Sequence, residues 1–324
     1  MRRKLYITVS VVALAGASSF AQESSSVTPH SFAYVLQAEG IGKTRQAALR
    51  CLRDCGREWI IIDPAYDDGK DGKWTAEGLQ TVRAGKAGRK VFAYLSIGEA
   101  ENYRSYWRRE WDANRDGKPD AKAPAWLCAE NPDWKGNYRV RYWQEPWQNI
   151  VLQSVDDAVR QGFDGIYLDV VDAFEFFEYN PAEKDWIDNR PNPETEHTYR
   201  EDMIAWVLRI AARARQQKPG FMVIPQNGAQ LLEQTDYVAA IDAVGVEDLF
   251  TDGKHPQPRE HVDEVLGYLR RITRAKKPVL VIEYGAAPKI RQRSFEGSRE
   301  NGFVVLVTDR ELKTLGRSEA VTEK

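Results

Sequence analysis

Short apolar runs alternate with longer amphipathic segments along most of the chain. Eight runs have the length and composition of buried strands: 32–37, 59–63, 91–97, 165–169, 221–226, 241–247, 279–283 and 303–308. Among the intervals, 147–162 has the clearest helical period, with Gly162 as its expected C-terminal cap. Eight strand–helix units predict an α/β fold, a (β/α)8 TIM barrel. A doubly wound open sheet is the alternative, disfavoured because no Gly-rich phosphate loop follows a strand.

Nearly every predicted strand ends on a polar residue. These ends are Gln37, Asp63, Ser96, Asp169, Gln226, Glu247, Glu283 and, just past the last strand, Asp309. Parallel barrel strands bring such ends to one rim, where barrel enzymes carry their active sites. Strand ends also turn polar simply on reaching solvent. That explanation accounts less well for repeated Asp and Glu, because clustered like charges repel.

The two-residue period of a strand predicts which of these acids point inward. Asp169 shares a face with Gly165 and Tyr167, and Glu247 shares a face with small residues such as Gly245. Both are therefore expected to point into the barrel mouth. The same argument places Glu283 inward. Asp172 lies beyond its strand, so the period does not fix its direction.

The interval 98–162 is too long for one crossover and predicts an insertion between the third and fourth strands. It holds six of the ten tryptophans: Trp107, Trp111, Trp126, Trp134, Trp143 and Trp147. Indole faces stack on sugar rings, and they also build local cores. Both roles are expected, with some indoles buried and one or two lining a cleft.

The same insertion contains a partial calcium-loop pattern. Asp112, Asn114, Asp116 and Asp120 fit its opening, but the twelfth position is Ala123 instead of Glu. A polar turn is the favoured interpretation, and calcium is the one cofactor left open. The cysteines Cys51, Cys55 and Cys128 are too few for a disulfide framework; a bridge from Cys128 to either of the others stays open.

The N-terminus reads as an export signal. Arg2, Arg3 and Lys4 precede a short apolar run and a small-residue cleavage site after Ala21, which predicts a signal peptide over 1–21. A membrane anchor is the alternative, but it needs about 20 apolar residues. Cleavage removes three positive charges and no negative one, so the net charge moves from −2 to −5. An acidic, exported chain is a poor candidate for binding nucleic acid.

The remaining chain is expected to be one domain. Residues 22–30 predict a flexible tether, 31–312 the barrel and 313–324 a polar tail. No later segment is apolar enough to cross a bilayer. The expected product is a monomer, either periplasmic or secreted.

Paired inward carboxylates with an aromatic insertion favour glycoside hydrolysis. One acid must protonate the leaving oxygen, while a second attacks the anomeric carbon or activates water. Asp169 and Glu247 lie on separate strands and meet that requirement; Glu283 is a further possible partner for Asp169. Competing chemistries find little support, since the chain has neither a Gly-x-Ser-x-Gly elbow nor paired metal-binding histidines.

Four segments resemble the endo-α-1,4-polygalactosaminidase-like family, glycoside hydrolase family 114. They are FAYLSIGEAENYRSYW, GFDGIYLDVVDAFEFF, VIPQNG and VGVEDLF, and the similarity spans about 32–309. The resemblance implies a secreted barrel that cleaves a galactosamine-containing polysaccharide, with Asp169 as nucleophile and Glu247 as acid/base. Glu101 and Arg104 match a family signature, as substrate contacts or as rim ion pairs. The tryptophan-rich insertion departs from the characterised members, so the reaction type carries over better than the sugar.

The predicted substrate contacts are the polar residues nearest these two acids. They are Asp63, Tyr94, Glu99, Glu101, Arg104, Asp172, Gln226, Asn227 and Glu283. For Asp172 a helix N-cap is an equal alternative, and for Asn227 a strand-end turn. The acidic rim favours a cationic sugar by Coulomb attraction. A non-catalytic polysaccharide-binding barrel and a glycosidase for another glycan remain as alternatives.

Overall fold

The structure, a computed structural model, describes residues 28–67, 72–285 and 287–319. The predicted signal peptide, 1–21, and most of the predicted tether lie outside the described residues. Of the tether, 28–30 are described, and His30 is held there by the carboxylate of Glu58.

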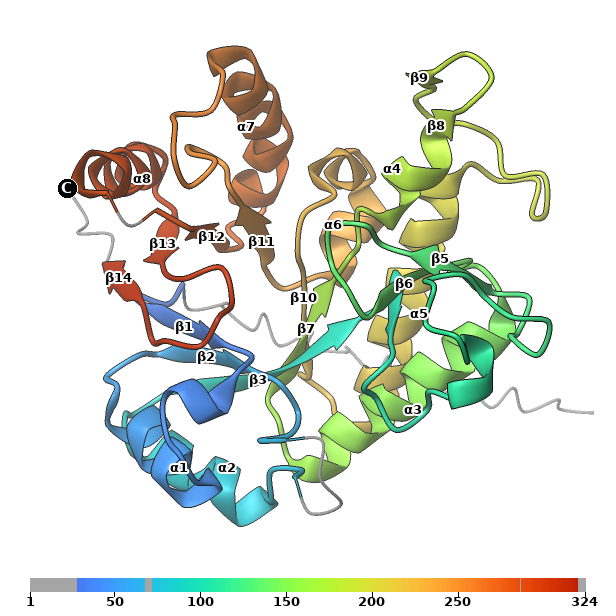
Figure 1. The fold of residues 1–324 in the computed structure, drawn as a ribbon. Helices are drawn as coiled ribbons and strands as arrows, with labels where there is room; N and C mark the ends of the chain where they lie inside the picture. Colours follow the sequence, from blue (N-terminus) through green and yellow to red (C-terminus); the bar gives the residue numbers. More distant parts are fainter. Residues whose placement is uncertain (1–27, 68–71, 286, 320–324) are drawn as a thin grey trace, which may run out of the picture.

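All eight predicted strands are present in two parallel sheets (Figure 1). The first sheet has the order β1 (Phe32–Val35), β2 (Trp59–Ile62), β3 (Lys90–Ser96), β7 (Gly165–Asp169) and β10 (Met222–Pro225). The second has β11 (Val244–Glu247), β12 (Val279–Glu283) and β13 (Val304–Val307), with β14 (Arg317–Glu319) antiparallel at its edge. A parallel bridge, Gln226 to Gly245, joins the sheets. The prediction of an α/β fold built on parallel strands is confirmed.

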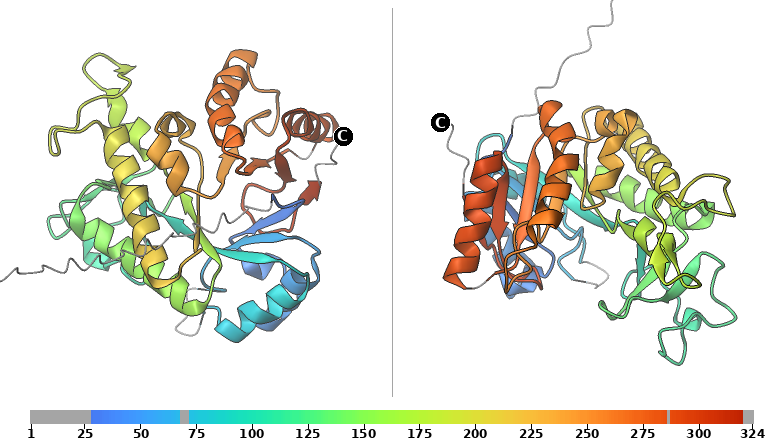
Figure 2. Two further views of the ribbon diagram at one scale, coloured as in Figure 1. Left: turned by 180° about the vertical axis from the view of Figure 1, so that it is seen from behind. Right: turned by 90° about the horizontal axis from the view of Figure 1, so that it is seen from above.

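Helices pack outside the strands, as Figure 2 shows from two further sides. The longer ones are α1 (Arg45–Asp54), α2 (Ala76–Ala84), α3 (Glu145–Gln161), α5 (Tyr199–Gln217), α7 (Arg259–Arg274) and α8 (Pro288–Asn301). The short ones are α4 (Ala173–Glu178), α6 (Thr235–Ala240), η1 (Ala38–Gly40), η2 (Arg109–Trp111) and η3 (Ala229–Glu233). Local sequence sets their limits: the side chain of Thr198 caps α5 in a capping box, and Gly162, with φ of 93°, ends α3 as predicted.

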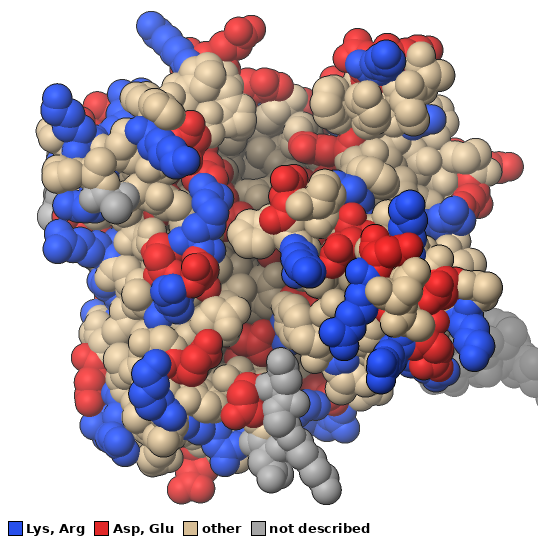
Figure 3. Space-filling view, in the orientation of Figure 1, with Lys and Arg blue, Asp and Glu red and all other residues tan. Residues whose placement is uncertain are grey.

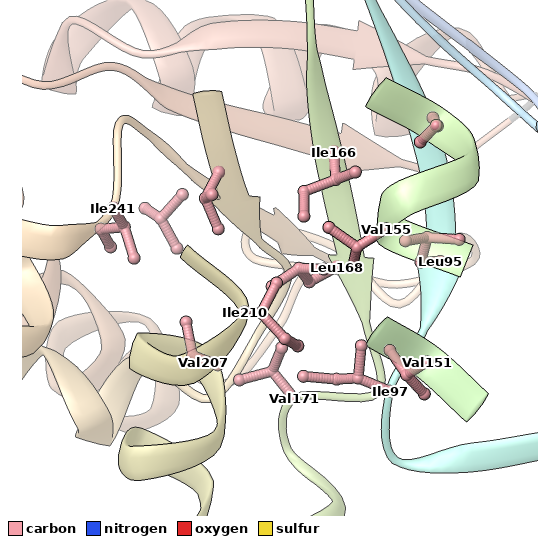
Figure 4. Close-up of a cluster of buried hydrophobic side chains, with 14 of the residues drawn as sticks. Leu95, Ile97, Val151, Val155, Ile166, Leu168, Val171, Val207, Ile210 and Ile241 are labelled. Carbon is pink, nitrogen blue, oxygen red and sulfur yellow. The ribbon is translucent and has the colours of Figure 1, made fainter. Parts of the chain in front are cut away.

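Each parallel strand is buried on both faces. On the outer face of β7, Ile166 and Leu168 meet Val155 of α3 and Ile210 of α5 (Figure 4). The inner faces of the strands, with Ala243 just before β11, contribute side chains to a second core: Phe32, Tyr34, Trp59, Ile61, Phe92, Tyr94, Tyr167, Ile224, Ala243, Leu280, Ile282, Val304 and Leu306. These residues come from both sheets, so the two sheets share one interior.

This division of the cores tests the predicted strand faces. Tyr167 lies in the inner core, so Asp169, two residues on, points inward as predicted. Ala243 places Glu247 on the inner face in the same way. The prediction for Glu283 is wrong: Leu280 and Ile282 face inward, and Glu283 faces the helices. A strand buried on both faces has no polar–apolar alternation to fix its phase.

Between β3 and α3 the chain forms a small antiparallel sheet at the rim. It has the order β4 (Glu99–Glu101), β6 (Asn137–Val140) and β5 (Leu127–Glu130). Trp111, Trp126 and Trp147 are buried, while Trp134 is 50% exposed. Another two-stranded hairpin, β8 (Tyr179–Asn180) and β9 (Asp185–Trp186), follows α4.

The chain end after β13 returns to the sheet. β14 pairs with β13 inside 313–324, the segment predicted to be a polar tail. The backbone N–H of Phe32 donates to Ser318 Oγ at 3.2 Å, and that of Leu36 donates to the carbonyl of Leu312 at 2.9 Å. The segment therefore lies against β1.

Gly245 of β11 is required by the residue opposite it. A Cβ there would lie 1.9 Å from the hydroxyl oxygen of Tyr167, a fully buried side chain. We expect Gly245→Ala to lower the free energy of unfolding by about 1–3 kcal/mol, because the overpacked ring must move. Urea denaturation measures this. Gly267→Ala in α7 is the matched control, because nothing lies within 4 Å of its Cβ and Ala is the better helix former. Equal effects of the two changes would contradict the prediction.

Candidate active site

A cavity of about 650 Å³ opens at the carboxyl ends of the strands. Seven of the predicted site residues line it: Asp169, Glu247, Tyr94, Glu99, Glu101, Asp172 and Asn227. Figure 3 looks onto this face, where acidic side chains lie around the central hollow. Strands that are far apart in the sequence therefore deliver their terminal carboxylates to one place.

Gln226 connects the two predicted catalytic acids. Its Nε2 donates to Asp169 Oδ1 and to Glu247 Oε2, each at 2.8 Å. The two carboxylate oxygens are therefore at most twice that distance, 5.6 Å, apart. Retaining glycosidases hold their two carboxyl groups about 5–5.5 Å apart. Gln226 is 1% exposed, so it holds the acids in place and does not contact a ligand in the cavity.

The backbone is unusual directly after each of these three residues. Val170, Asn227 and Asp248 have φ of 57°, 62° and 49°. Non-glycine residues seldom adopt positive φ, and a β-branched residue such as Val170 is a clear outlier. Such strain costs of order 1–3 kcal/mol and is found where function fixes the geometry. Here the positive φ values change the direction of the backbone directly after Asp169, Gln226 and Glu247.

Each acid has its own hydrogen-bond donors. Asp169 accepts from the hydroxyl of Tyr94 at 2.7 Å and from the backbone of Val170 at 2.8 Å. Glu247 accepts from the hydroxyl of Tyr284, which also lines the cavity. Tyr284 is absent from the sequence prediction. The alternation Leu280, Ile282, Tyr284 would have indicated it had the phase of β12 been known.

Burial raises the pKa of both acids. For Glu247, burial and then the nearby charge of Asp169 raise the pKa to about 7, against the Tyr284 hydrogen bond, which lowers it. Burial also raises the pKa of Asp169, while the bond from Tyr94 lowers it. Two carboxyl groups this close do not both ionise readily. At neutral pH the site can therefore hold one proton donor beside one carboxylate.

Asp172 is a third acid in the cavity. It occupies the N-cap position of α4, yet its side chain makes no capping hydrogen bond. Burial first, and then the charges of Glu175 and Asp169, raise its pKa well above the ordinary value. The side chain of Asp172 is thus free of a capping role. A cation or hydroxyl group bound in the cavity would offset the cost of burying its charge.

Asp63 and Arg104 lie behind the cavity wall, where they form an ion-pair network. The guanidinium of Arg104 contacts Asp63 at 2.7 Å and Glu101 at 2.7 Å. Neither Asp63 nor Arg104 lines the cavity. The network holds Glu101, which does line it. The expected ion pairs are thus formed, and contact with a substrate stays a prediction.

Glu283 and the calcium-loop residues serve local structure. Glu283 is fully buried and accepts from the backbone N–H groups of Phe250 and Thr251 at 2.7 and 3.1 Å. It fixes the loop after β11 and lies outside the cavity. Asp112 accepts from the N–H groups of Asp116 and Gly117 at 3.1 and 3.0 Å, as a polar turn does.

The part of the chain that the structure describes also bears on metal binding, disulfide bonds and membrane spans. Within it, no group of three or more His, Cys, Asp or Glu side chains is placed to hold a metal ion. Cys51, Cys55 and Cys128 are free thiols, so the open disulfide pairings are not formed. Of the described helices, none is long and apolar enough to span a bilayer.

Comparison with known proteins identifies the class to which this site belongs. The family model of glycoside-hydrolase family GH114 matches residues 64–323, so the chain belongs to this family and is a glycoside hydrolase. An uncharacterised protein of Deinococcus radiodurans is 38% identical over 281 residues, 86% of this chain and 81% of that protein. One of Methanocaldococcus jannaschii is 35% identical over 79% of this chain and 71% of that protein.

Two solved structures share the fold. The glycoside hydrolase domain of PelA from Pseudomonas aeruginosa has a TM-score of 0.60 at 19% identity, over 90% of this chain and 99% of that domain. Aspergillus fumigatus Ega3 in complex with galactosamine has a TM-score of 0.54 at 19% identity, over 82% of this chain and 88% of that one. Both support the α/β architecture described above.

Proposed function

We propose that the chain is a retaining endo-glycosidase that cleaves an amino-sugar polysaccharide, with α-1,4-linked galactosamine as the first substrate to test. Asp169 is the nucleophile and Glu247 the acid/base. The observation that carries the proposal is the double hydrogen bond of Gln226, which limits the separation of the two acids to 5.6 Å. The galactosamine in the complex with Ega3 supports the choice of sugar.

The proposed function includes a closed (β/α)8 barrel, with the catalytic site at the mouth of the barrel. One inner core drawn from both sheets and the bridge from Gln226 to Gly245 support it. With the predicted signal peptide 1–21, the proposed enzyme is exported, and it is periplasmic or secreted. It acts as a monomer on a polysaccharide.

The reaction follows from the protonation states of the two acids. An oxygen of Asp169 attacks the anomeric carbon as the bond to the leaving sugar breaks, and Glu247 gives its proton to the departing oxygen. The product is a glycosyl ester of Asp169. Glu247, now ionised, takes a proton from water, whose oxygen displaces Asp169 from the anomeric carbon. The configuration is retained, and both carboxyl groups return to their starting states.

The proposed preference of the enzyme for a cationic sugar rests on Asp172. Its carboxyl group lines the cavity beside Asp169, and burial makes its negative charge costly. A substrate ammonium group placed against it would supply the missing counter-charge. Glu99, also in the cavity, adds to the same field.

The direct test is release of reducing ends from α-1,4-linked galactosamine polymer by the purified wild-type protein. We expect release, with the α-anomer as the first product seen by NMR because the configuration is retained. Release of the β-anomer would overturn the retaining mechanism. No release from this polymer, but release from another glycan in a parallel panel, would overturn the choice of sugar. If the protein binds a glycan but releases reducing ends from none of the glycans in the panel, it is a non-catalytic barrel.

A further inference from the structure

Two exposed aromatic side chains line the cavity on the wall formed by the segment between β3 and α3. Trp134 is 50% exposed and Tyr103 is 46% exposed. The other tryptophans of this segment are buried, as Trp111, Trp126 and Trp147 are, or pack against the core. Trp134 differs from them because its indole faces the cavity.

Hydrogen bonds order the backbone of the turn that carries Trp134. Asn131, at its start, donates from Nδ2 to Glu99 Oε1 at 2.8 Å. At its end, the carbonyl of Gly136 accepts from the N–H of Asn102 at 2.8 Å. The turn is thus fixed at both ends of β4, which places Trp134 at the cavity.

Tyr103 is fixed in a similar way. Its hydroxyl donates to Glu101, and the guanidinium of Arg104 lies over its ring, 5.0 Å from the centroid. Arg104 is itself anchored by Asp63. The cation covers one face of the ring, so the remaining exposed area of Tyr103 belongs to its edge and its other face.

We propose that Trp134 and Tyr103 form a further sugar-binding subsite of the cleft, which takes a hexose ring of the polymer beyond those held at Asp169 and Glu247. The inference rests on the proposed function. Sugar rings present CH groups to the negative face of an aromatic ring, and an exposed indole is suited to this contact. Asn137 and Lys135, which line the same part of the cavity, can bond hydroxyl groups of that ring.

The consequence is a dependence on chain length. The two acids lie at the ends of β7 and β11, whereas the aromatic pair lies on the insertion. The proposal places Trp134 beyond the reach of a one-sugar substrate bound at the two acids. A longer oligosaccharide gains the stacking contact and should therefore be the better substrate.

The test compares Trp134→Ala with wild type on two substrates. For α-1,4-linked galactosamine oligosaccharides we expect kcat/KM to fall by about tenfold, mostly through KM, because a stacking contact of this size is lost. For an activated aryl α-galactosaminide we expect no change. Trp134→Tyr restores an aromatic face and should recover much of the loss.

Trp186→Ala is the matched control. Trp186 is 63% exposed on the β8–β9 hairpin and does not line the cavity. Equal losses in the two alanine variants, or an equal loss on both substrates, would overturn the subsite. Calorimetric binding of the same oligosaccharides to Asp169→Asn, with and without Trp134→Ala, keeps the subsite testable apart from hydrolysis. If the wild type hydrolyses nothing, the proposed function fails. The subsite is then tested by the calorimetric affinities alone: weaker binding with Trp134→Ala supports it, and equal binding contradicts it.

Discussion

Asp169→Asn is expected to lower kcat on the polymer by at least about 10⁴-fold, because a neutral amide cannot form the glycosyl ester. The change is close to isosteric. The new Nδ2 can take the position of Oδ2 and donate to the hydroxyl of Tyr94, while Oδ1 still accepts from Gln226. Reducing-end release over long incubations measures the loss. Residual activity within about tenfold of wild type would remove Asp169 from the role of nucleophile.

The stability of this variant separates lost chemistry from lost folding. Burial raises the pKa of Asp169 in the folded state above its ordinary value of 3.8. A raised pKa means that the group's contribution to stability is complete below the ordinary value and is lost as pH rises through the folded value. At neutral pH the charge of Asp169 therefore costs folding free energy. Asp169→Asn should unfold at the same temperature as wild type or higher, and an unfolded variant would make the activity loss uninformative.

Removal of the whole carboxyl group provides a positive readout for the same role. In Asp169→Gly, space opens beside the anomeric carbon, and added azide or formate can enter it. We expect such anions to restore turnover of an activated aryl glycoside. Rescue of Asp172→Gly instead would place the nucleophile at Asp172.

The sequence predicts the strands well because each is a short apolar run with a polar end. Apolar runs separated by amphipathic helices place the parallel strands within a few residues, and the polar ends fall at the cavity. The sequence orients Asp169 and Glu247 correctly because each shares its face of the strand with a glycine, Gly165 or Gly245, which distinguishes that face from the aliphatic one. Gly245 in particular leaves the room that Tyr167 fills.

The failures follow from what a single strand does not encode. In β12 every residue from Val279 to Ile282 is aliphatic, so the sequence gives no phase for Glu283, and Tyr284 is missed with it. Gln226 has no signal of its own beyond its position at a strand end. Its role depends on Asp169 and Glu247, which lie 57 and 21 residues away.

The tryptophan-rich segment shows a similar limit. Composition predicts that some indoles are buried and some line a cleft, but not which ones. Trp134 is the exposed one, in a turn ordered by the bond from Asn131 to Glu99 and by the bond from the N–H of Asn102 to the carbonyl of Gly136. Which of these aromatic side chains a substrate can reach depends on tertiary contacts between segments, and composition does not contain that information.

Glu247 should control the high-pH side of the activity profile. Cleavage needs its protonated form, and burial together with Asp169 raises its pKa to about 7. We therefore expect kcat/KM to fall as pH rises through about 7. Glu247→Gln should lower the rate on polymer by about 10²–10⁴-fold and remove this fall. With a dinitrophenyl glycoside, whose leaving group needs no proton, formation of the glycosyl ester should survive the change.

Two tyrosines allow the two sides of the profile to be moved separately. The hydroxyl of Tyr284 lowers the pKa of Glu247, so Tyr284→Phe raises that pKa and keeps the acid protonated to higher pH. The high-pH side should then move upward. The hydroxyl of Tyr94 lowers the pKa of Asp169, so Tyr94→Phe should move the low-pH side upward instead, because the nucleophile must be ionised. The values belong to a coupled pair, so each change also moves the other side slightly. If both variants shift the same side, Asp169 and Glu247 do not divide the roles of nucleophile and acid between them.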